Sequence, residues 1–308
     1  MKKTNNFWLG VLLFGIIISV PEGTLIRVVG DSLSVSMMTT LRYGVAALFA
    51  VPFVLAALKK GQVTTKRIVY MALLAIPLSL DPLISQYVIA TTNASFQAVL
   101  SLFTPIVFVI ISSILTRDKV TRNKIVGFLF AVLGGTVMVA LPHLGSVSAT
   151  NYGSLPVILM FIQAICISFE ILVWRKENER GTPLVVILGV FYFVWAVIAG
   201  IMAVLFGEIH QVQNLTTTSL LIVIYLGLIA SIFYNAVFTD FYRYVGTTSA
   251  ATMKYFKKAL TIIMPIIVLG EVMSWQIALG TLLIIMGTVI VHEPKQLKGR
   301  NTTSQKRL

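Results

Sequence analysis

The amino-acid sequence predicts an all-α membrane protein with ten transmembrane helices, arranged as two inverted five-helix repeats. First, 57% of the 308 residues are hydrophobic and 11% are charged, whereas soluble domains carry roughly 25% charged residues. Second, apolar segments long enough to cross a hydrocarbon core of about 30 Å recur along the chain. Third, Lys and Arg concentrate in alternate loops. This composition excludes an ordinary soluble enzyme and an intrinsically disordered chain.

The apolar segments define the expected spans. They are Phe7–Ile26, Leu33–Leu58, Ile68–Tyr87, Ala94–Leu115, Ile125–Leu141, Leu155–Trp174, Leu184–Phe206, Leu220–Phe241, Ala250–Leu269 and Trp275–Val291. The first follows Lys2 and Lys3, as in a signal peptide, but no small-residue cleavage site precedes the next apolar run. We therefore expect an uncleaved first span.

The basic residues indicate how the chain is oriented. The formal net charge is +13, which in a soluble protein would suggest nucleic acid. However, most of the 24 Lys and Arg residues fall on the side that holds both termini: Lys2, Lys3, Lys59, Lys60, Lys66, Arg67, Arg117, Lys119, Arg122, Lys124, Arg175, Lys176, Arg180, Arg243, Lys295, Lys298, Arg300, Lys306 and Arg307. The opposite loops contain none. We therefore expect cytoplasmic termini in a bacterial inner (cytoplasmic) membrane, and no nucleic-acid partner.

A motif that occurs twice in the sequence predicts the two repeats. Gly135-Thr136-Val137 in the fifth span matches Gly287-Thr288-Val289 in the tenth, at an offset of 152 residues. The division expected from it is residues 1–145, residues 146–292 and a basic cytoplasmic tail, 293–308. Because each repeat has an odd number of spans, the second is inverted, an arrangement that recurs in secondary transporters. Chance recurrence of Gly-Thr-Val in apolar helices is the alternative.

Several kinds of chemistry lack the residues they require. Cys166 is the single cysteine, and His143, His210 and His292 have no partner at metal-ligand spacing. We therefore expect no metal, no cofactor and no catalytic residues. No Gly-x4-Gly-Lys-Ser/Thr motif is present either, so the chain has no nucleotide motor of its own.

Three lysines lie within the ninth expected span, where an ionisable group is costly. Lys254, Lys257 and Lys258 share one helical face. Lys254 is shallow enough for its ammonium to reach the interface, but Lys258 lies about 15 Å deep at 1.5 Å per residue. Two ammonium groups near the midplane favour an anionic substrate group: a carboxylate, phosphate or sulfonate.

The acidic residues within spans allow two interpretations. Glu22, next to Pro21, and Asp81, next to Pro82, are candidates for a coupling proton. Either could instead pair with Arg42 or Arg27, and structural pairing is the commoner arrangement. Glu170 and Asp240 are expected near the cytoplasmic interface or at a gate.

Other polar side chains in the spans are secondary candidates, after the lysines, for lining a substrate site. They are Tyr234, Asn235, Gln97, Ser101, Gln163 and Trp195. Hydrogen bonding between helices is an equal alternative for each. Prolines within or at the edge of spans predict broken helices or hinges: Pro21, Pro77, Pro82, Pro105 and Pro265.

Motifs spread over the whole chain resemble the drug/metabolite transporter superfamily, EamA type. They are Leu41-Arg42-Tyr43, Thr104-Pro105, the run from Tyr225 to Gly246 and Gly270-Glu271. The resemblance extends from Trp8 to Val291. It implies a carrier of two inverted five-helix repeats that moves metabolites by alternating access.

The lysine pair departs from the EamA pattern, which commonly has a proline there. Phe256-Lys257-Lys258-Ala259 resembles instead the triose-phosphate and nucleotide-sugar translocators. In the phosphate translocators, an adjacent Lys-Arg pair grips the substrate phosphate. Their further lysine in the fourth span is replaced here by Ser101, so that contact is missing.

The sequence therefore predicts a secondary active transporter of a small organic metabolite with an anionic group. The expected substrate contacts are Lys257, Lys258, Lys254, Tyr234, Asn235, Gln97, Ser101 and Arg42. An exporter of amino acids or of neutral or cationic drug-like compounds is one alternative, and a channel or membrane receptor is another. Expected partners are the substrate and the lipid bilayer, with a homodimer left open.

Overall fold

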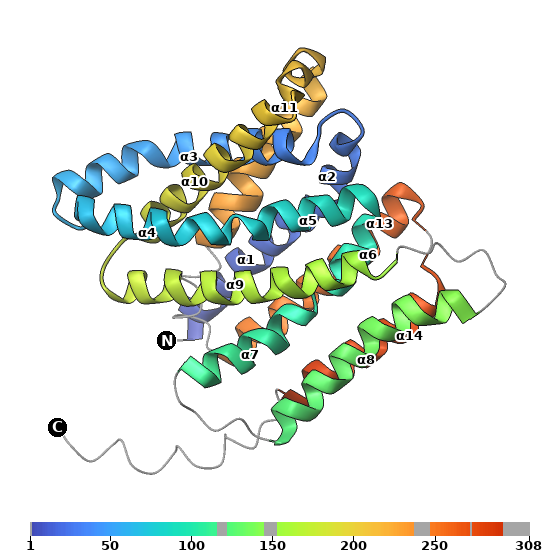
Figure 1. Ribbon diagram of the computed structural model, residues 1–308. Helices are drawn as coiled ribbons and strands as arrows, with labels where there is room; N and C mark the ends of the chain where they lie inside the picture. Colours follow the sequence, from blue (N-terminus) through green and yellow to red (C-terminus); the bar gives the residue numbers. More distant parts are fainter. Residues whose placement is uncertain (1, 116–121, 145–152, 237–246, 272, 292–308) are drawn as a thin grey trace, which may run out of the picture.

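The computed structural model describes residues 2–115, 122–144, 153–236, 247–271 and 273–291, and all its regular elements there are helical (Figure 1). The elements are α1 (Lys2–Ser19), α2 (Glu22–Gly30), α3 (Val35–Lys59), α4 (Thr65–Leu78), α5 (Leu80–Thr91), α6 (Ala94–Leu100), α7 (Phe103–Leu115), α8 (Arg122–Leu144), α9 (Leu155–Glu179), α10 (Leu184–Leu205), η1 (Glu208–Asn214), α11 (Thr217–Tyr225), η2 (Leu226–Phe233), α13 (Thr247–Leu269) and α14 (Trp275–Val291).

Within the described residues, 7 helical stretches are long and apolar enough to cross a membrane. These stretches correspond to the first four expected spans and to the sixth, seventh and eighth. The fifth and tenth contain the shorter apolar helices Ile125–Val137 and Trp275–Gly287. The ninth is helical as α13, but its lysines interrupt the apolar pattern. The chain is therefore an integral, multi-pass membrane protein.

Three of the long stretches are each built from two helices. The breaks fall between α1 and α2, at Ser79 between α4 and α5, and between α6 and α7. Pro21, Pro82 and Pro105 lie at or within the first turn after a break, where proline removes no hydrogen bond that the helix needs. Pro265, by contrast, lies inside the continuous helix α13, so the helix is not broken there.

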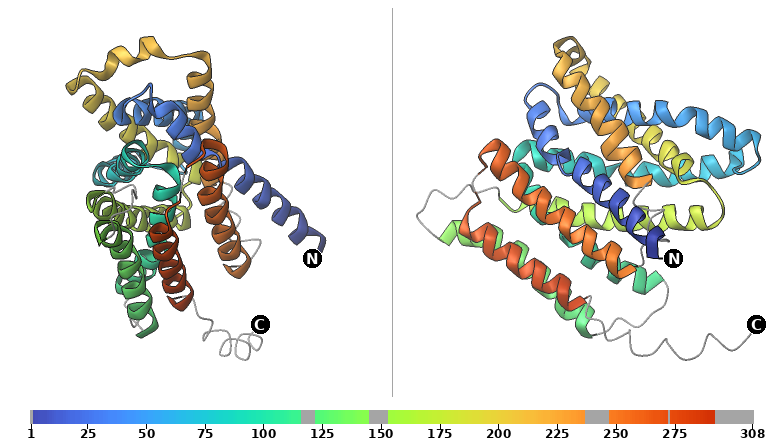
Figure 2. Two further views of the ribbon diagram at one scale, coloured as in Figure 1. Left: turned by 90° about the vertical axis from the view of Figure 1, so that its right-hand side faces the viewer. Right: turned by 180° about the vertical axis from the view of Figure 1, so that it is seen from behind.

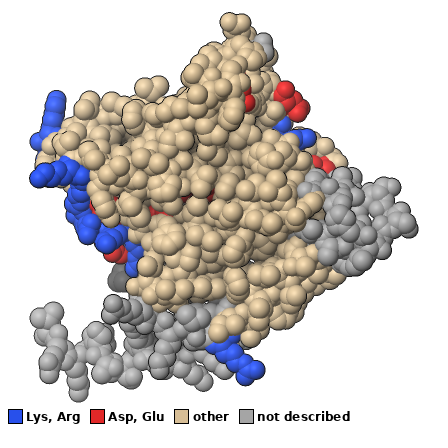
Figure 3. Space-filling view, in the orientation of Figure 1, with Lys and Arg blue, Asp and Glu red and all other residues tan. Residues whose placement is uncertain are grey.

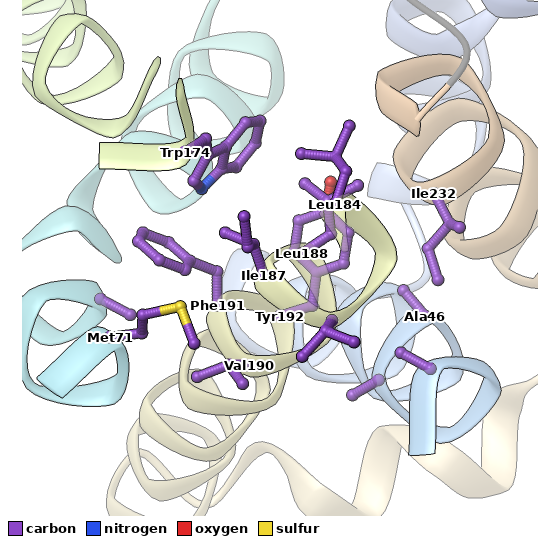
Figure 4. Packing of buried hydrophobic residues seen from close by; sticks show 14 of the residues in the cluster. Ala46, Met71, Trp174, Leu184, Ile187, Leu188, Val190, Phe191, Tyr192 and Ile232 are labelled. Carbon is purple, nitrogen blue, oxygen red and sulfur yellow. The ribbon is translucent and has the colours of Figure 1, made fainter. Parts of the chain in front are cut away.

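The largest core cluster lies where α3 and α10 pack together. Gly189 of α10 approaches Ala50 of α3 so closely that an added Cβ would lie 2.4 Å from the alanine Cβ. On another side of α10, Phe191 packs edge-on against Trp174 of α9, with ring centroids 5.9 Å apart, and Figure 4 shows Met71 of α4 beside them. These contacts hold four helices around one apolar core.

A second close pair, α8 and α14, lies side by side at one edge of the molecule (Figures 1 and 2). A Cβ on Gly134 would lie 2.6 Å from the carbonyl oxygen of Gly280, and one on Gly287 would lie 2.4 Å from that of Gly127. The contacts are reciprocal, and the two helices run antiparallel. They relate Gly127 to Gly280 and Gly134 to Gly287, one residue further than the expected offset.

The surface separates charged from apolar regions. Large apolar side chains are exposed along the helices, as at Leu48, Leu205 and Ile267. Blue side chains gather at one end of the view in Figure 3, around the turn from α3 to α4, while tan covers most of the rest. This surface fits a chain that contacts lipid along its sides and water at its ends.

Candidate functional site

Arg42 of α3 is the best-paired cation within the described spans. Its Nη2 lies 2.6 Å from Oε1 of Glu22, and its Nε donates to Oγ of Ser231 at 3.0 Å. Its guanidinium carbon also lies 5.0 Å from the ring centroid of Tyr43. The Arg42 side chain is 5% exposed and that of Glu22 30% exposed. Of the two arginines considered for Glu22, Arg42 is the partner, whereas Arg27 donates to the carbonyl oxygen of Ala90.

Glu22 occupies the first turn of α2, directly after the break at Pro21. A helix N-terminus carries a partial positive charge that favours a carboxylate. Glu22 therefore has two sources of stabilisation, the helix end and Arg42.

The π-helical segment η2 supplies the other contact of Arg42. In η2 the Ser231 hydroxyl donates to the carbonyl oxygen of Leu226, five residues back. The carbonyl oxygen of Ser231 accepts from the Tyr192 hydroxyl at 3.1 Å and from Nδ2 of Asn235 at 2.9 Å. The same Asn235 nitrogen also donates to the Tyr192 oxygen. Because π-helical turns concentrate at functional sites, this segment belongs to the candidate site.

The lysine pair of α13 faces two different helices. The Lys258 ammonium donates to Oγ of Ser101, at the break between α6 and α7. The Lys257 ammonium lies 3.4 Å from the centroid of the Tyr234 ring, a cation–π contact. Both side chains are half-buried. Ser101 therefore contacts Lys258 directly.

These two groups of residues form one electrostatic cluster. Glu22 interacts with Lys257 and Lys258 as well as with Arg42. Among the described residues the cluster contains the cations Arg42, Lys257 and Lys258 and the carboxylate of Glu22, contributed by α2, α3 and α13. The carboxyl group of Asp81 also interacts electrostatically with Arg42 and Lys258.

Asp81 belongs to a neighbouring group that the sequence revealed only in part. Asp81, in the first turn of α5, accepts from Nε2 of Gln163 at 2.7 Å. Its carboxyl group also lies close enough to the carboxyl group of Glu170 for the two to interact. Asp81 and Glu170 are 8% and 3% exposed. Glu170 was expected near the cytoplasmic interface or at a gate, and the structure buries its side chain within the protein, more than two turns before α9 ends at Glu179.

The remaining candidates differ in their surroundings. Gln97 donates to Oγ of Ser85 at 2.9 Å, a contact between helices of the same half of the chain. Trp195 donates to the carbonyl oxygen of Ala75 at 3.2 Å and is buried among aromatic rings, so its role is helix packing. The backbone of Lys254 lies in α13, but its side chain is outside those that the structure describes, as is all of Asp240.

Sequence reasoning missed Ser231, Tyr192 and Glu170. Ser231 and Tyr192 are ordinary polar residues of transmembrane helices. No sequence pattern predicts the π-helical turn in which Ser231 contacts both Arg42 and Tyr192. Glu170 did carry a signal, since apolar residues continue on both sides of it.

Glu271 at the end of α13 makes a further contact between distant parts of the chain. Its carboxylate accepts from the backbone N–H groups of Ala94 and Ser95, at 2.9 Å each, and from the Ser95 hydroxyl. It thereby caps the N-terminus of α6. Within the described residues, no cluster of His, Cys, Asp and Glu could hold a metal ion.

The helices, their apolar surface and the buried charged cluster define a polytopic membrane protein of the transporter type. The profile of the EamA-like transporter family matches the chain twice, over residues 6–140 and 154–292. The chain therefore belongs to the EamA-like transporter family, whose members are transporters of small molecules and not enzymes.

Other comparisons add information about the fold alone. No curated protein matches the chain. One solved structure, titled only as the crystal structure of a protein, shares 16% sequence identity with it at a TM-score of 0.53. That match covers 90% of this chain and 96% of the other.

Proposed function

We propose that this transporter is a secondary active carrier that moves a small organic metabolite with an anionic group by alternating access. The observation that carries the proposal is the gathering of Arg42, Lys257 and Lys258 around Glu22 in the described part of the chain. Asp81 also interacts electrostatically with Arg42 and Lys258. An anionic substrate would give these cations a further partner in an environment where charge is costly to bury.

The lysines are suited to hold such a group. In the structure Lys258 contacts a neutral hydroxyl and Lys257 an aromatic face. Both interactions are weaker than a charge-assisted hydrogen bond to a carboxylate or phosphate. Substrate would therefore replace the Ser101 contact of Lys258 with a stronger one. Tyr234 and Asn235, which follow η2, would border the substrate. Gln97, one turn before Ser101, would lie near it.

The proposed architecture is ten spans in two inverted repeats, residues 1–145 and 146–292, followed by a tail at 293–308. The two family matches support two homologous halves. The reciprocal, antiparallel contacts of α8 and α14 support the inversion, because a two-fold axis in the membrane plane turns a helix against its counterpart. Broken helices around Glu22, Asp81 and Ser101 are typical of carriers with a site near the midplane.

The proposed orientation has both termini in the cytoplasm of a bacterial cell, with the chain in the inner membrane. The support is the collection of basic residues at one end, around the turn from α3 to α4 and the end of α9 (Figure 3). The proposed partners of the chain do not include nucleic acid. A homodimer stays an alternative that light scattering of the purified protein would decide.

Counterflow in proteoliposomes tests the function. Vesicles preloaded with lactate, malate, glycerol 3-phosphate or methanesulfonate would be offered the same radiolabelled anion outside. A carrier of anions gives saturable counterflow with at least one of them. Signals confined to neutral, cationic or zwitterionic amino-acid probes would support the exporter alternative, and fast, non-saturating flux would support a channel.

The role of the lysines is tested by Lys257→Gln and Lys258→Gln. Each substitution removes one charge from the cluster, so we expect the apparent affinity for the anion to fall by about tenfold or more, equivalent to ~1.4 kcal/mol. Lys60→Gln, which changes an exposed residue at the end of α3, is the matched control and should leave the affinity unchanged. Unaltered affinity in both lysine variants would remove the proposed anion contact.

A further inference from the structure

A buried pair of carboxyl groups lies apart from the charged cluster that the proposed function uses. The carboxyl groups of Asp81 of α5 and Glu170 of α9 lie close enough to interact with one another. Nε2 of Gln163, two turns before Glu170 on α9, donates to Oδ1 of Asp81 at 2.7 Å. Both carboxyl groups are buried, and within the described residues neither forms a salt bridge.

Two carboxylates in such contact cannot both remain ionised, because like charges repel strongly where water is excluded. One proton between them turns the repulsion into a hydrogen bond. The surroundings indicate which group holds it. Asp81 accepts from the Gln163 amide, whereas Oε2 of Glu170 is buried without a hydrogen-bond partner. A bare carboxylate oxygen would be costly there, which favours Glu170 as the neutral acid and Asp81 as the carboxylate.

Titratable and charged groups on every packed element bear on this pair. Arg42 and Tyr43 of α3, Glu22 of α2, Cys166 of α9, Tyr192 of α10 and Lys258 of α13 interact electrostatically with one or both acids. The helices α6 and α7 contribute no titratable side chain. In α4, Arg67 pairs with Glu177. Arg42 already binds Glu22 and Ser231.

The pair also bridges the two family repeats. Asp81 lies in the first matched segment and Glu170 in the second. Alternating access moves one repeat against the other, so the distance between the two acids changes with the conformation of the carrier. A site that holds a proton in one arrangement then releases it in another.

We propose that Asp81 and Glu170 share one proton in the state described here and form the site that couples transport to the proton gradient. The inference rests on the proposed function of the chain as a secondary carrier. Loading adds a second proton, which binds a carboxylate oxygen of Asp81 and leaves the pair neutral. It is released to water on the other side of the membrane.

The proton and the anion reinforce one another through Lys258. Asp81 interacts electrostatically with Lys258, so protonating Asp81 removes a negative charge from the surroundings of the proposed anion contact. Anion affinity therefore rises as pH falls, and by linkage anion binding takes up a proton. This coupling has the sign of symport: anion and proton move in the same direction.

Infrared difference spectroscopy on the protein in lipid tests the shared proton without any substrate. Wild type should show the C=O stretch of a buried, protonated carboxyl group. That band should be absent or shifted in Asp81→Asn and in Glu170→Gln and unchanged in Glu179→Gln, which alters an acid of the same helix whose side chain is 60% exposed. An unchanged band in both pair variants, or no such band in wild type, would overturn the proposal.

A second readout concerns coupling. Uptake of the four anions named above is measured with and without an inward gradient of about one pH unit, which supports up to about tenfold accumulation for one proton per anion. The ratio of uptake with the gradient to uptake without it should exceed one in wild type and in Glu179→Gln. It should fall to about one in Asp81→Asn and Glu170→Gln. A full ratio in both pair variants would contradict the proposal.

The outcomes separate the two proposals. If no anion is transported by any variant but the infrared band behaves as expected, the proposed function fails while the protonated pair stands. If counterflow of an anion is saturable in wild type but the band is absent, the function stands and the pair is not the proton site.

Discussion

Arg42 illustrates how a single residue is accommodated inside a membrane protein. Its guanidinium uses its planar shape, with Nη2 on Glu22, Nε on Ser231 and the ring of Tyr43 nearby. An ammonium is a point charge without this fixed fork of donors. Arg42 therefore ties together α2, α3 and η2, and its geometry contributes as much as its charge.

Substituting Arg42 should expose this dependence. Arg42→Gln leaves Glu22 beside the lysines without its main partner, and breaking a buried pair costs up to about 3–5 kcal/mol. Since the Glu22 side chain is 30% exposed, we expect the lower part of that range. Thermal unfolding in detergent, followed by size-exclusion chromatography, measures the effect.

The double variant Arg42→Gln with Glu22→Gln provides the control. It removes both charges, so it should be more stable than Arg42→Gln alone. Arg42→Lys should fall between wild type and Arg42→Gln, because it restores the charge without the Nε contact. Equal melting temperatures for Arg42→Gln and wild type would show that the pair contributes nothing to stability.

At the scale of elements, close helix contacts depend on glycine. On α8 and α14, glycines place a carbonyl oxygen of each helix directly against the other. Small residues at such crossings are the common means of packing transmembrane helices, because lipid gives no hydrophobic drive for helices to associate. The same packing explains why these two helices stay paired at the edge of the molecule (Figure 2).

Gly134→Ala should therefore destabilise the protein. Its Cβ would lie 2.6 Å from a backbone oxygen and 2.7 Å from Cγ1 of Ile284, so the helices must separate. Overpacking of this kind costs about 1–3 kcal/mol, measured as a lower melting temperature in detergent.

Gly44→Ala is the matched control, because Gly44 is also helical but has nothing within 4 Å of the added Cβ. It should be neutral or stabilising by up to about 1 kcal/mol, since alanine favours the helix. Equal melting temperatures for Gly134→Ala and Gly44→Ala would contradict the close contact.

At the scale of the whole molecule, the distribution of charge predicts the orientation in the membrane. Basic residues gather at one end and are absent from the short loops at the other (Figure 3). By the positive-inside rule, we predict that the basic end lies in the cytoplasm.

Cysteine labelling tests this orientation. In a Cys166→Ala background, Lys60→Cys and His210→Cys each introduce one exposed thiol, at opposite ends of the described helices. In intact cells a membrane-impermeant maleimide should label His210→Cys and not Lys60→Cys. Labelling of Lys60→Cys alone would invert the proposed topology.

The class of fold follows from the sequence alone, because hydrophobic length and basic-residue bias are local properties of each segment. Trp275–Val291, for instance, was delimited to the residue. The lysines of α13 and Glu22 were likewise recognisable, since charge inside an apolar run is visible in one dimension.

Which of these groups meet depends on the tertiary structure. The partner of Glu22 was open between Arg27 and Arg42, Ser101 stood as a missing contact, and Glu170 was expected at an interface. Each answer depends on helix breaks, a π-helical turn and the rotation of one helix against another. Those features arise from contacts between residues far apart in the chain, so no local pattern could specify them.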